Sequence, residues 1–253
     1  MPDQLVAPYL SIDGLRATLV MIFAIAQIVV GSWPQIKKSD HSIAIRSANL
    51  DTPLIPFGPF FAIWLPIFAL CMAYATWQIL PSNLSDPFLR DIGFLAAGIF
   101  LANTLWEAYV PKYGLGWPST FILATSACLG IWCVSLISQE LPELSSYEYW
   151  LVAVPLLFLA GWLCLAVFAN LSSTLVKAKS VLDPRTILGA SILILIAGAL
   201  VSQIGALSAS LVFVSSAIWG LVGIITAIFI KDKPKPIAWV AGFAILLILY
   251  RTL

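Results

Sequence analysis

The stretch YWLVAVPLLFLAGWLCLAVFANLSS, residues 149–173, contains no charged side chain. At a helical rise of ~1.5 Å per residue it is ~38 Å long, which exceeds the ~30 Å hydrocarbon core of a bilayer. A soluble helix seldom continues so far without a charge on its solvent face. The stretch therefore predicts a transmembrane helix.

The composition of the whole chain agrees with this prediction. Of the 253 residues, 61% are hydrophobic and only 10% are charged, and the mean hydropathy is +1.00. Soluble domains carry about a quarter charged residues. We therefore expect a multi-pass integral membrane protein, with the lipid bilayer as its solvent, in a bacterial cytoplasmic membrane or an organellar membrane. The net charge of +1 offers no basic field for nucleic acid, so nucleic-acid partners are excluded.

Apolar segments of similar length recur along the chain. Each is long enough for one span, and the breaks between them carry prolines and charges. The break near residues 205–208 has no charge and is the weakest. The sequence predicts an all-α bundle of eight transmembrane helices at about 17–33, 57–80, 89–110, 118–138, 149–173, 186–206, 209–230 and 236–251.

The distribution of positive charge supports this count. Arg16, Arg90 and Arg251 fall on one side of an eight-span topology, and ten cations fall on the other. Cytoplasmic loops carry the excess of Lys and Arg, so we expect both termini outside the cytoplasm. The ten cations are Lys37, Lys38, Arg46, Lys112, Lys177, Lys179, Arg185, Lys231, Lys233 and Lys235.

Residues suited to metal binding or catalysis are scarce. The single histidine, His41, has no second histidine to form a metal or haem site, and the four cysteines never make a C-x-x-C spacing. Glu107 is the only carboxylate well inside a predicted span, where it is either an interfacial anchor or a binding group. We expect no metal site and no catalytic residues, and hydrolytic chemistry is not favoured.

Aromatic and amide side chains gather at one depth instead. If the loop 34–56 is cytoplasmic, Trp64, Asn103, Trp106, Trp162 and Asn170 all lie in the half of the membrane next to it. Buried indole N–H groups need a partner or a wet cavity. The cluster is therefore either interhelical packing or a ligand pocket that the loop covers.

Three motifs resemble those of the tryptophan-rich sensory proteins, the TspO family, which are relatives of the mitochondrial translocator protein. PFGPFFAIWLPIF at 56–68, followed by Met72 to Ala75, is similar to the family's second helix. Asn103-Thr104-Leu105-Trp106 is similar to the L-N-x-x-W of its third helix. Trp162, Ala166 and Asn170 reproduce the W-x-x-x-A-x-x-x-N spacing of its fifth helix. The resemblance covers about residues 17–176.

This resemblance implies a five-helix bundle over residues 1–176, with a three-helix extension over 177–253 that has no counterpart in the family fold. It also implies a membrane receptor or regulator that binds porphyrins, other tetrapyrroles or sterols beneath loop 34–56, where Lys38 or Arg46 can meet carboxylates. The alternative functions are a transporter or permease for a hydrophobic solute and an accessory subunit of a larger membrane complex. The partner is then a second copy of the chain, in a homodimer, or another membrane protein. The candidate ligand-binding residues are Trp64, Phe60, Phe68, Asn103, Trp106, Glu107, Trp162, Ala166 and Asn170.

Overall fold

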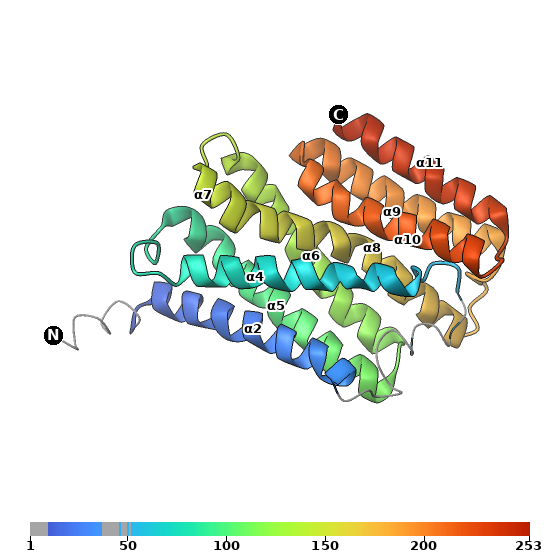
Figure 1. Cartoon of the computed structure of the whole chain (residues 1–253), viewed down its shortest axis with the longest axis horizontal. Coiled ribbons are helices and arrows are strands. Elements are labelled where there is room, and N and C mark those ends of the chain that lie inside the picture. Colours follow the sequence, from blue (N-terminus) through green and yellow to red (C-terminus); the bar gives the residue numbers. More distant parts are fainter. Residues whose placement is uncertain (1–9, 37–45, 47–49, 51) are drawn as a thin grey trace.

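The computed structural model describes residues 10–36, 46, 50 and 52–253, and this part of the chain is helical without any strand. Eight helical stretches are long and apolar enough to cross a membrane (Figure 1). In order they are α2 (Ile12–Ile36), η2 (Gly58–Ile63) with α4 (Trp64–Gln78), α5 (Pro87–Tyr113), α6 (Trp117–Glu140), α7 (Ser146–Glu148) with η3 (Tyr149–Ala153) and α8 (Val154–Lys177), α9 (Ile187–Ser208), α10 (Leu211–Ile230), and α11 (Lys235–Thr252).

The prediction of eight spans is confirmed, including the uncharged break between the sixth and seventh. There Ala209 adopts a left-handed conformation with φ 44°, which ends α9. Ser210 then caps α10 by accepting a hydrogen bond from the Phe213 N–H at 3.2 Å. A short side-chain cap replaces the charged loop found at the other breaks.

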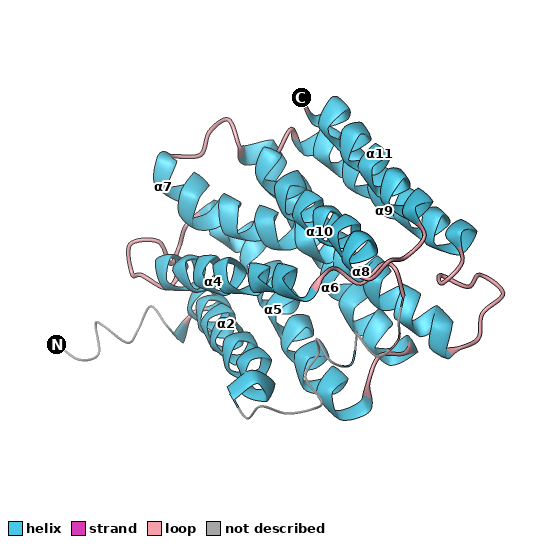
Figure 2. Ribbon diagram, turned by 45° about the vertical axis from the view of Figure 1, so that its right-hand side comes forward, coloured by secondary structure: helices cyan, strands magenta, loops and turns pink. Residues whose placement is uncertain are grey.

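The helix α8 lies at the centre of the bundle. It packs against α4 and α6 on one side and against α9 and α10 on the other (Figures 1 and 2). Its Gly161 contacts α10 so closely that an added Cβ would overlap the main-chain oxygen of Phe213. The helices α9 and α10 therefore pack directly on the helix that carries Trp162 and Asn170, and α11 packs on α9 and α10.

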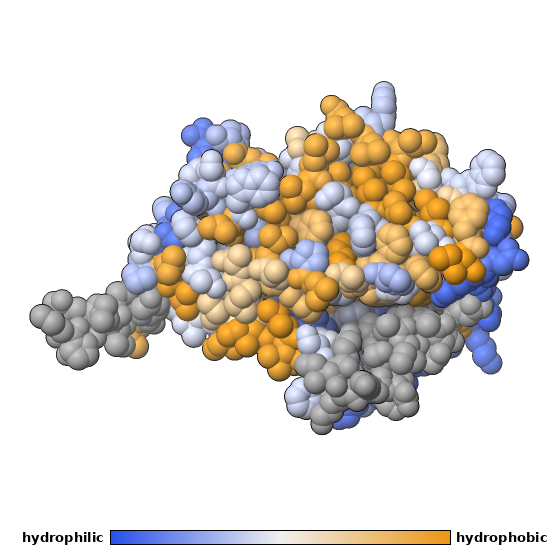
Figure 3. Space-filling view, viewed as in Figure 1, coloured by the Kyte–Doolittle hydropathy of each residue, from blue (hydrophilic) through white to orange (hydrophobic). Residues whose placement is uncertain are grey.

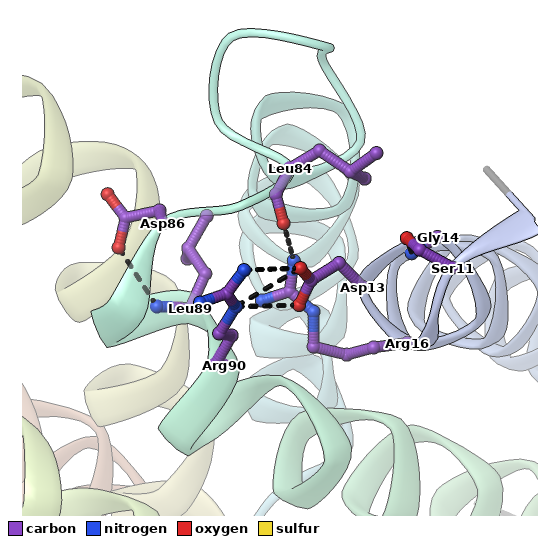
Figure 4. Close-up of polar contacts among 8 residues, drawn as sticks. All are labelled: Ser11, Asp13, Gly14, Arg16, Leu84, Asp86, Leu89 and Arg90. Carbon is purple, nitrogen blue, oxygen red and sulfur yellow. Dashed lines mark hydrogen bonds and ion pairs between the residues drawn. The ribbon is translucent and has the colours of Figure 1, made fainter. Parts of the chain in front are cut away.

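The start of α2 is tied to α5 by polar contacts at one end of the bundle (Figure 4). Arg90 forms an ion pair with Asp13 at 2.7 Å, and the buried Arg16 donates to the main-chain oxygen of Leu84 at 2.7 Å. Asp86 caps α5 by accepting from the Leu89 N–H. These contacts hold the first and third spans side by side and parallel.

The molecular surface has the pattern of a membrane protein. Hydrophobic residues cover the middle of the face seen in Figure 3, and hydrophilic residues collect at the two ends. Many large apolar side chains are exposed around the bundle, such as Leu65, Phe121 and Leu246. Exposed apolar surface of this extent is stable only against lipid. The protein is a multi-pass integral membrane protein.

Candidate functional site

An aromatic cluster lies between α4 and α8. The rings of Trp64 and Trp162 meet edge to face, with centroids 6.2 Å apart, and Phe61 meets Trp162 in the same way at 6.4 Å. Trp64 also contacts Phe68, at 5.4 Å, one turn further along α4. These edge-to-face and tilted arrangements suit the quadrupoles of the rings.

These rings form one wall of a partly enclosed cavity. Its volume is ≈ 40 Å³ for the centres of water-sized spheres, which is room for about three waters. Nearly all of the surface is apolar, and the amide of Asn170 provides a polar group. The lining residues are Ile55, Pro56, Phe61, Trp64, Trp106, Leu115, Leu123, Trp162, Leu165, Ala166, Ala169 and Asn170.

The segment 52–57 covers the cavity and is held at both ends. The hydroxyl groups of Thr52 and Ser172 share a hydrogen bond of 2.8 Å, which ties the segment to α8. The Phe57 N–H donates to the main-chain oxygen of Gly223 at 2.9 Å, which ties it to α10. Ile55 and Pro56, between these two ties, are buried and line the cavity. The segment is the described end of the loop 34–56.

A polar network fixes the amide of Asn170. Its Oδ1 accepts from Trp106 Nε1 at 3.1 Å and from Ser119 Oγ at 3.3 Å, and its Nδ2 donates to Thr120 Oγ1 at 2.7 Å. Thr120 also shares a hydrogen bond of 2.8 Å with Thr174. The network joins α5, α6 and α8 and orients the indole of Trp106 beside the cavity. The Asn170 amide is fully used by protein partners.

The indole of Trp162 differs from that of Trp106. Trp162 is 3% exposed, and its Nε1 has no hydrogen-bond partner in the described part of the chain. An N–H buried in apolar surroundings without an acceptor costs about 1–3 kcal/mol. Trp162 lines the cavity, so an acceptor atom of a ligand placed there would recover this cost.

Of the predicted site residues, five line the cavity: Trp64, Trp106, Trp162, Ala166 and Asn170. The other four lie outside its lining. Phe60 packs against Trp219 of α10, with ring centroids 4.8 Å apart, and Phe68 lies behind Trp64. Their contacts place both residues beside the cavity wall rather than on it.

The two remaining candidates, Asn103 and Glu107, face α2 and α6 instead. Asn103 bonds to Gln27 at 3.4 Å and accepts from Ser126 at 2.8 Å. The Glu107 carboxyl lies against Gly31 of α2. Lys38 lies outside the described residues, and Arg46 donates to the main-chain oxygen of Pro111 at 3.0 Å.

Three hydroxyl residues of the network, Ser119, Thr120 and Thr174, were not among the predicted site residues. Thr174 lies one turn beyond Asn170 on α8, a spacing that places both on one face. Ser119 and Thr120 start α6, where hydroxyls are common caps and carry no depth signal. In the described residues, no three His, Cys, Asp or Glu side chains meet as a metal site.

Comparison with known families decides the relationship of this chain. The model of the TSPO-like protein family matches residues 17–253. The chain belongs to the TSPO-like family. The matched range includes α9, α10 and α11, which the three motifs had not reached, so this TSPO-like chain resembles the family model over all eight spans. Neither the curated proteins nor the solved structures contain a match.

Proposed function

We propose that this TSPO-like protein is a membrane receptor for a flat hydrophobic ligand of the tetrapyrrole or sterol type, bound in the aromatic cavity between α4, α5, α6 and α8. The observation that carries the proposal is that Trp162 lines an aromatic cavity and that its buried Nε1 has no hydrogen-bond partner in the described residues. Most buried N–H groups in proteins have a hydrogen-bond acceptor, so an indole N–H without one needs an explanation beyond helix packing.

The chemistry of the lining favours a conjugated ring. Indole and phenyl rings of Trp64, Phe61 and Trp162 offer faces for stacking, and Ile55 with Pro56 offers a flat apolar cover. Trp162 Nε1 is a donor only, so the ligand must present an acceptor at its edge, such as a carbonyl, a carboxylate or an unprotonated ring nitrogen. Family membership adds weight to this ligand class by analogy.

Ligand binding requires the cavity to open. Sites for ligands of this size have volumes of about 300–1,000 Å³, against ≈ 40 Å³ here. The element that we propose to move is segment 52–57, because it covers the cavity and, unlike the walls, is not part of a transmembrane helix. Its movement would break the Thr52–Ser172 and Phe57–Gly223 bonds and expose buried side chains such as Leu54. We propose that the ligand displaces this segment outward while the Asn170 network keeps its geometry.

The test is saturable quenching of tryptophan fluorescence by protoporphyrin in reconstituted protein. Each stacked indole contributes about 1 kcal/mol beyond the area it buries, so Trp162→Leu should weaken binding several-fold to tenfold or more. Trp162→Phe should give a smaller loss, because it keeps one aromatic ring for stacking although it removes the N–H and the second ring of the indole.

The matched control is Trp239→Leu, at an indole that is 75% exposed on α11. Affinity should be unchanged in that variant. If Trp162→Leu and Trp239→Leu lose the same affinity for protoporphyrin while both proteins stay folded, the buried indoles serve helix packing only. That result would contradict the receptor proposal.

A further inference from the structure

The carboxyl group of Glu107 is buried between the first and third spans. The residue is 2% exposed, and a Cβ at Gly31 of α2 would lie 2.8 Å from its Cδ and Oε1. Its Oε2 has no hydrogen-bond partner, and among the described Lys, Arg and His residues none forms an ion pair with it. Glycine at position 31 thus provides space for a buried carboxyl group whose Oε2 has no hydrogen-bond partner in the described part of the chain.

The charge state of the Glu107 carboxyl group depends on a proton or a cation that binds to it. An unpaired carboxylate in an apolar environment is very costly, so the carboxyl group must hold a proton or pair with a cation. Intramembrane carboxyl groups that face a cavity commonly mark a ligand or ion site.

Pro111 adds a second acceptor at the same place. It lies inside α5, four residues after Glu107. Proline has no N–H, so the main-chain oxygen of Glu107 lacks its usual helical donor. One residue therefore presents both a carboxyl group and a main-chain oxygen that the helix leaves without its i+4 bond.

An open hollow lies over these acceptors. It is formed by Val29, Val30 and Trp33 of α2 with Glu107, Ala108 and Pro111 of α5, and its volume is ≈ 330 Å³ by the measure that gives ≈ 40 Å³ for the aromatic cavity. The two sites share no lining residue. Trp33 contributes an indole, whose face attracts cations.

An apolar track leads away from the hollow. On α2, the side chains of Val29, Ile25 and Ile22 are about half exposed and follow one another toward the middle of the bilayer. Glu107 lies about five and a half turns into α5 from Pro87, which is at the end that the charge pattern predicts to be extracytoplasmic. The hollow is therefore near the loop side that carries most of the positive charges. An amphiphile with its head group at Glu107 would lie in the orientation that lipids adopt.

We propose that this hollow binds a lipophilic amine, with its ammonium group on the carboxylate and main-chain oxygen of Glu107, beside the ring of Trp33, and its hydrocarbon chain along α2. An ammonium group has three N–H donors, which match the acceptors here. If a neutral amine meets the protonated acid, the proton moves from the Glu107 carboxyl oxygen to the amine nitrogen, and the ion pair forms without any other reactant.

The test uses octylamine and the full chain reconstituted in phosphatidylcholine vesicles, which contain no primary amine. The protein should bind octylamine saturably above the background of partition into lipid, and it should not bind octanol in this way. Glu107→Gln should weaken octylamine binding at least tenfold, and Pro111→Ala, which restores a donor to the main-chain oxygen, should weaken it several-fold. Glu140→Gln, at the exposed end of α6, should have no effect.

Infrared difference spectra give a second measurement that does not depend on the affinity of a variant. Octylamine should convert the signal of a protonated carboxyl group into that of a carboxylate, and this change should be absent in Glu107→Gln. Saturable binding that is equal in Glu107→Gln and Glu140→Gln, or an unchanged carboxyl signal, would overturn the proposal.

A further arm identifies the source of the amine. Vesicles that contain phosphatidylethanolamine should compete with octylamine if the natural occupant is a lipid head group, and no competition assigns the site to a free amine. Glu107→Gln should leave protoporphyrin quenching unchanged, so failure of this proposal and failure of the receptor proposal can be told apart.

Discussion

At the scale of single residues, Asn170 carries the clearest energetic role. Its amide satisfies the Trp106 N–H and two hydroxyl groups of α6. Asn170→Leu leaves the buried Trp106 N–H without this acceptor, at a cost of about 1–3 kcal/mol. Ser119 and Thr120 lose one partner each but keep their bonds to the main-chain oxygen of Gly116. We expect the free energy of unfolding in detergent to fall by about 2 kcal/mol or more.

The control for this substitution is Thr125→Val, on the exposed face of α6, where the hydroxyl bonds only to the main-chain oxygen of Phe121. Its stability should change by no more than about 0.5 kcal/mol. If both variants unfold alike, the Asn170 network does not hold α5, α6 and α8 together.

The sequence predicts how far along its helix a side chain lies, but it does not predict which neighbouring helix the side chain faces. Trp106 and Asn103 occupy one depth on α5, but three residues of helix turn them apart by ~60°. One meets α8 and the other meets α2 and α6. A sequence fixes how far along a helix a side chain lies, whereas the rotation of the helix depends on its packing partners.

At the scale of helices, the contact between α8 and α10 depends on Gly161. A Cβ there would overlap Phe213 and lie 2.5 Å from Ser216 Oγ. Gly161→Ala should therefore force the two helices apart and lower the melting temperature, despite the better helix propensity of alanine.

Gly242 of α11 is the matched comparison. Nothing lies within 4 Å of a Cβ added at this helical glycine, so Gly242→Ala should be neutral or stabilising by up to about 1 kcal/mol. A Gly161→Ala protein as stable as Gly242→Ala would contradict the close packing of α8 on α10.

Helix boundaries show where sequence patterns suffice. Charged, proline-rich breaks located the other span boundaries, because charged side chains are costly inside a bilayer. The uncharged break between α9 and α10 followed from the length of the apolar stretch, which is enough for two spans. The 3₁₀ start of the second span, η2, and the π turn η3 before α8 were not predicted. Both are local adjustments to packing, which the hydrophobic pattern does not encode.

At the scale of the whole molecule, the family assignment and the eight-helix bundle follow from sequence, but the orientation in the membrane stays a prediction. The excess of cations places the loops after the first, third, fifth and seventh spans in the cytoplasm. Ser82→Cys, between α4 and α5, should react with an impermeant thiol reagent added outside cells, whereas Ala178→Cys, between α8 and α9, should react only after permeabilisation. Both positions are exposed, and the reverse pattern would invert the topology.

The measurement that tests the receptor proposal most directly is fluorine NMR of protein labelled with 5-fluorotryptophan, which gives a signal for each of the ten indoles. Single Trp→Phe variants assign the signals. On titration with protoporphyrin, the signals of Trp64, Trp106 and Trp162, which line the cavity, should shift saturably with one common affinity. The signals of Trp117, Trp150 and Trp239, which are exposed toward lipid or its interface, should stay in place. Shifts confined to the exposed indoles, or spread equally over all ten, would show that the ligand only coats the surface and would contradict a binding site in the aromatic cavity.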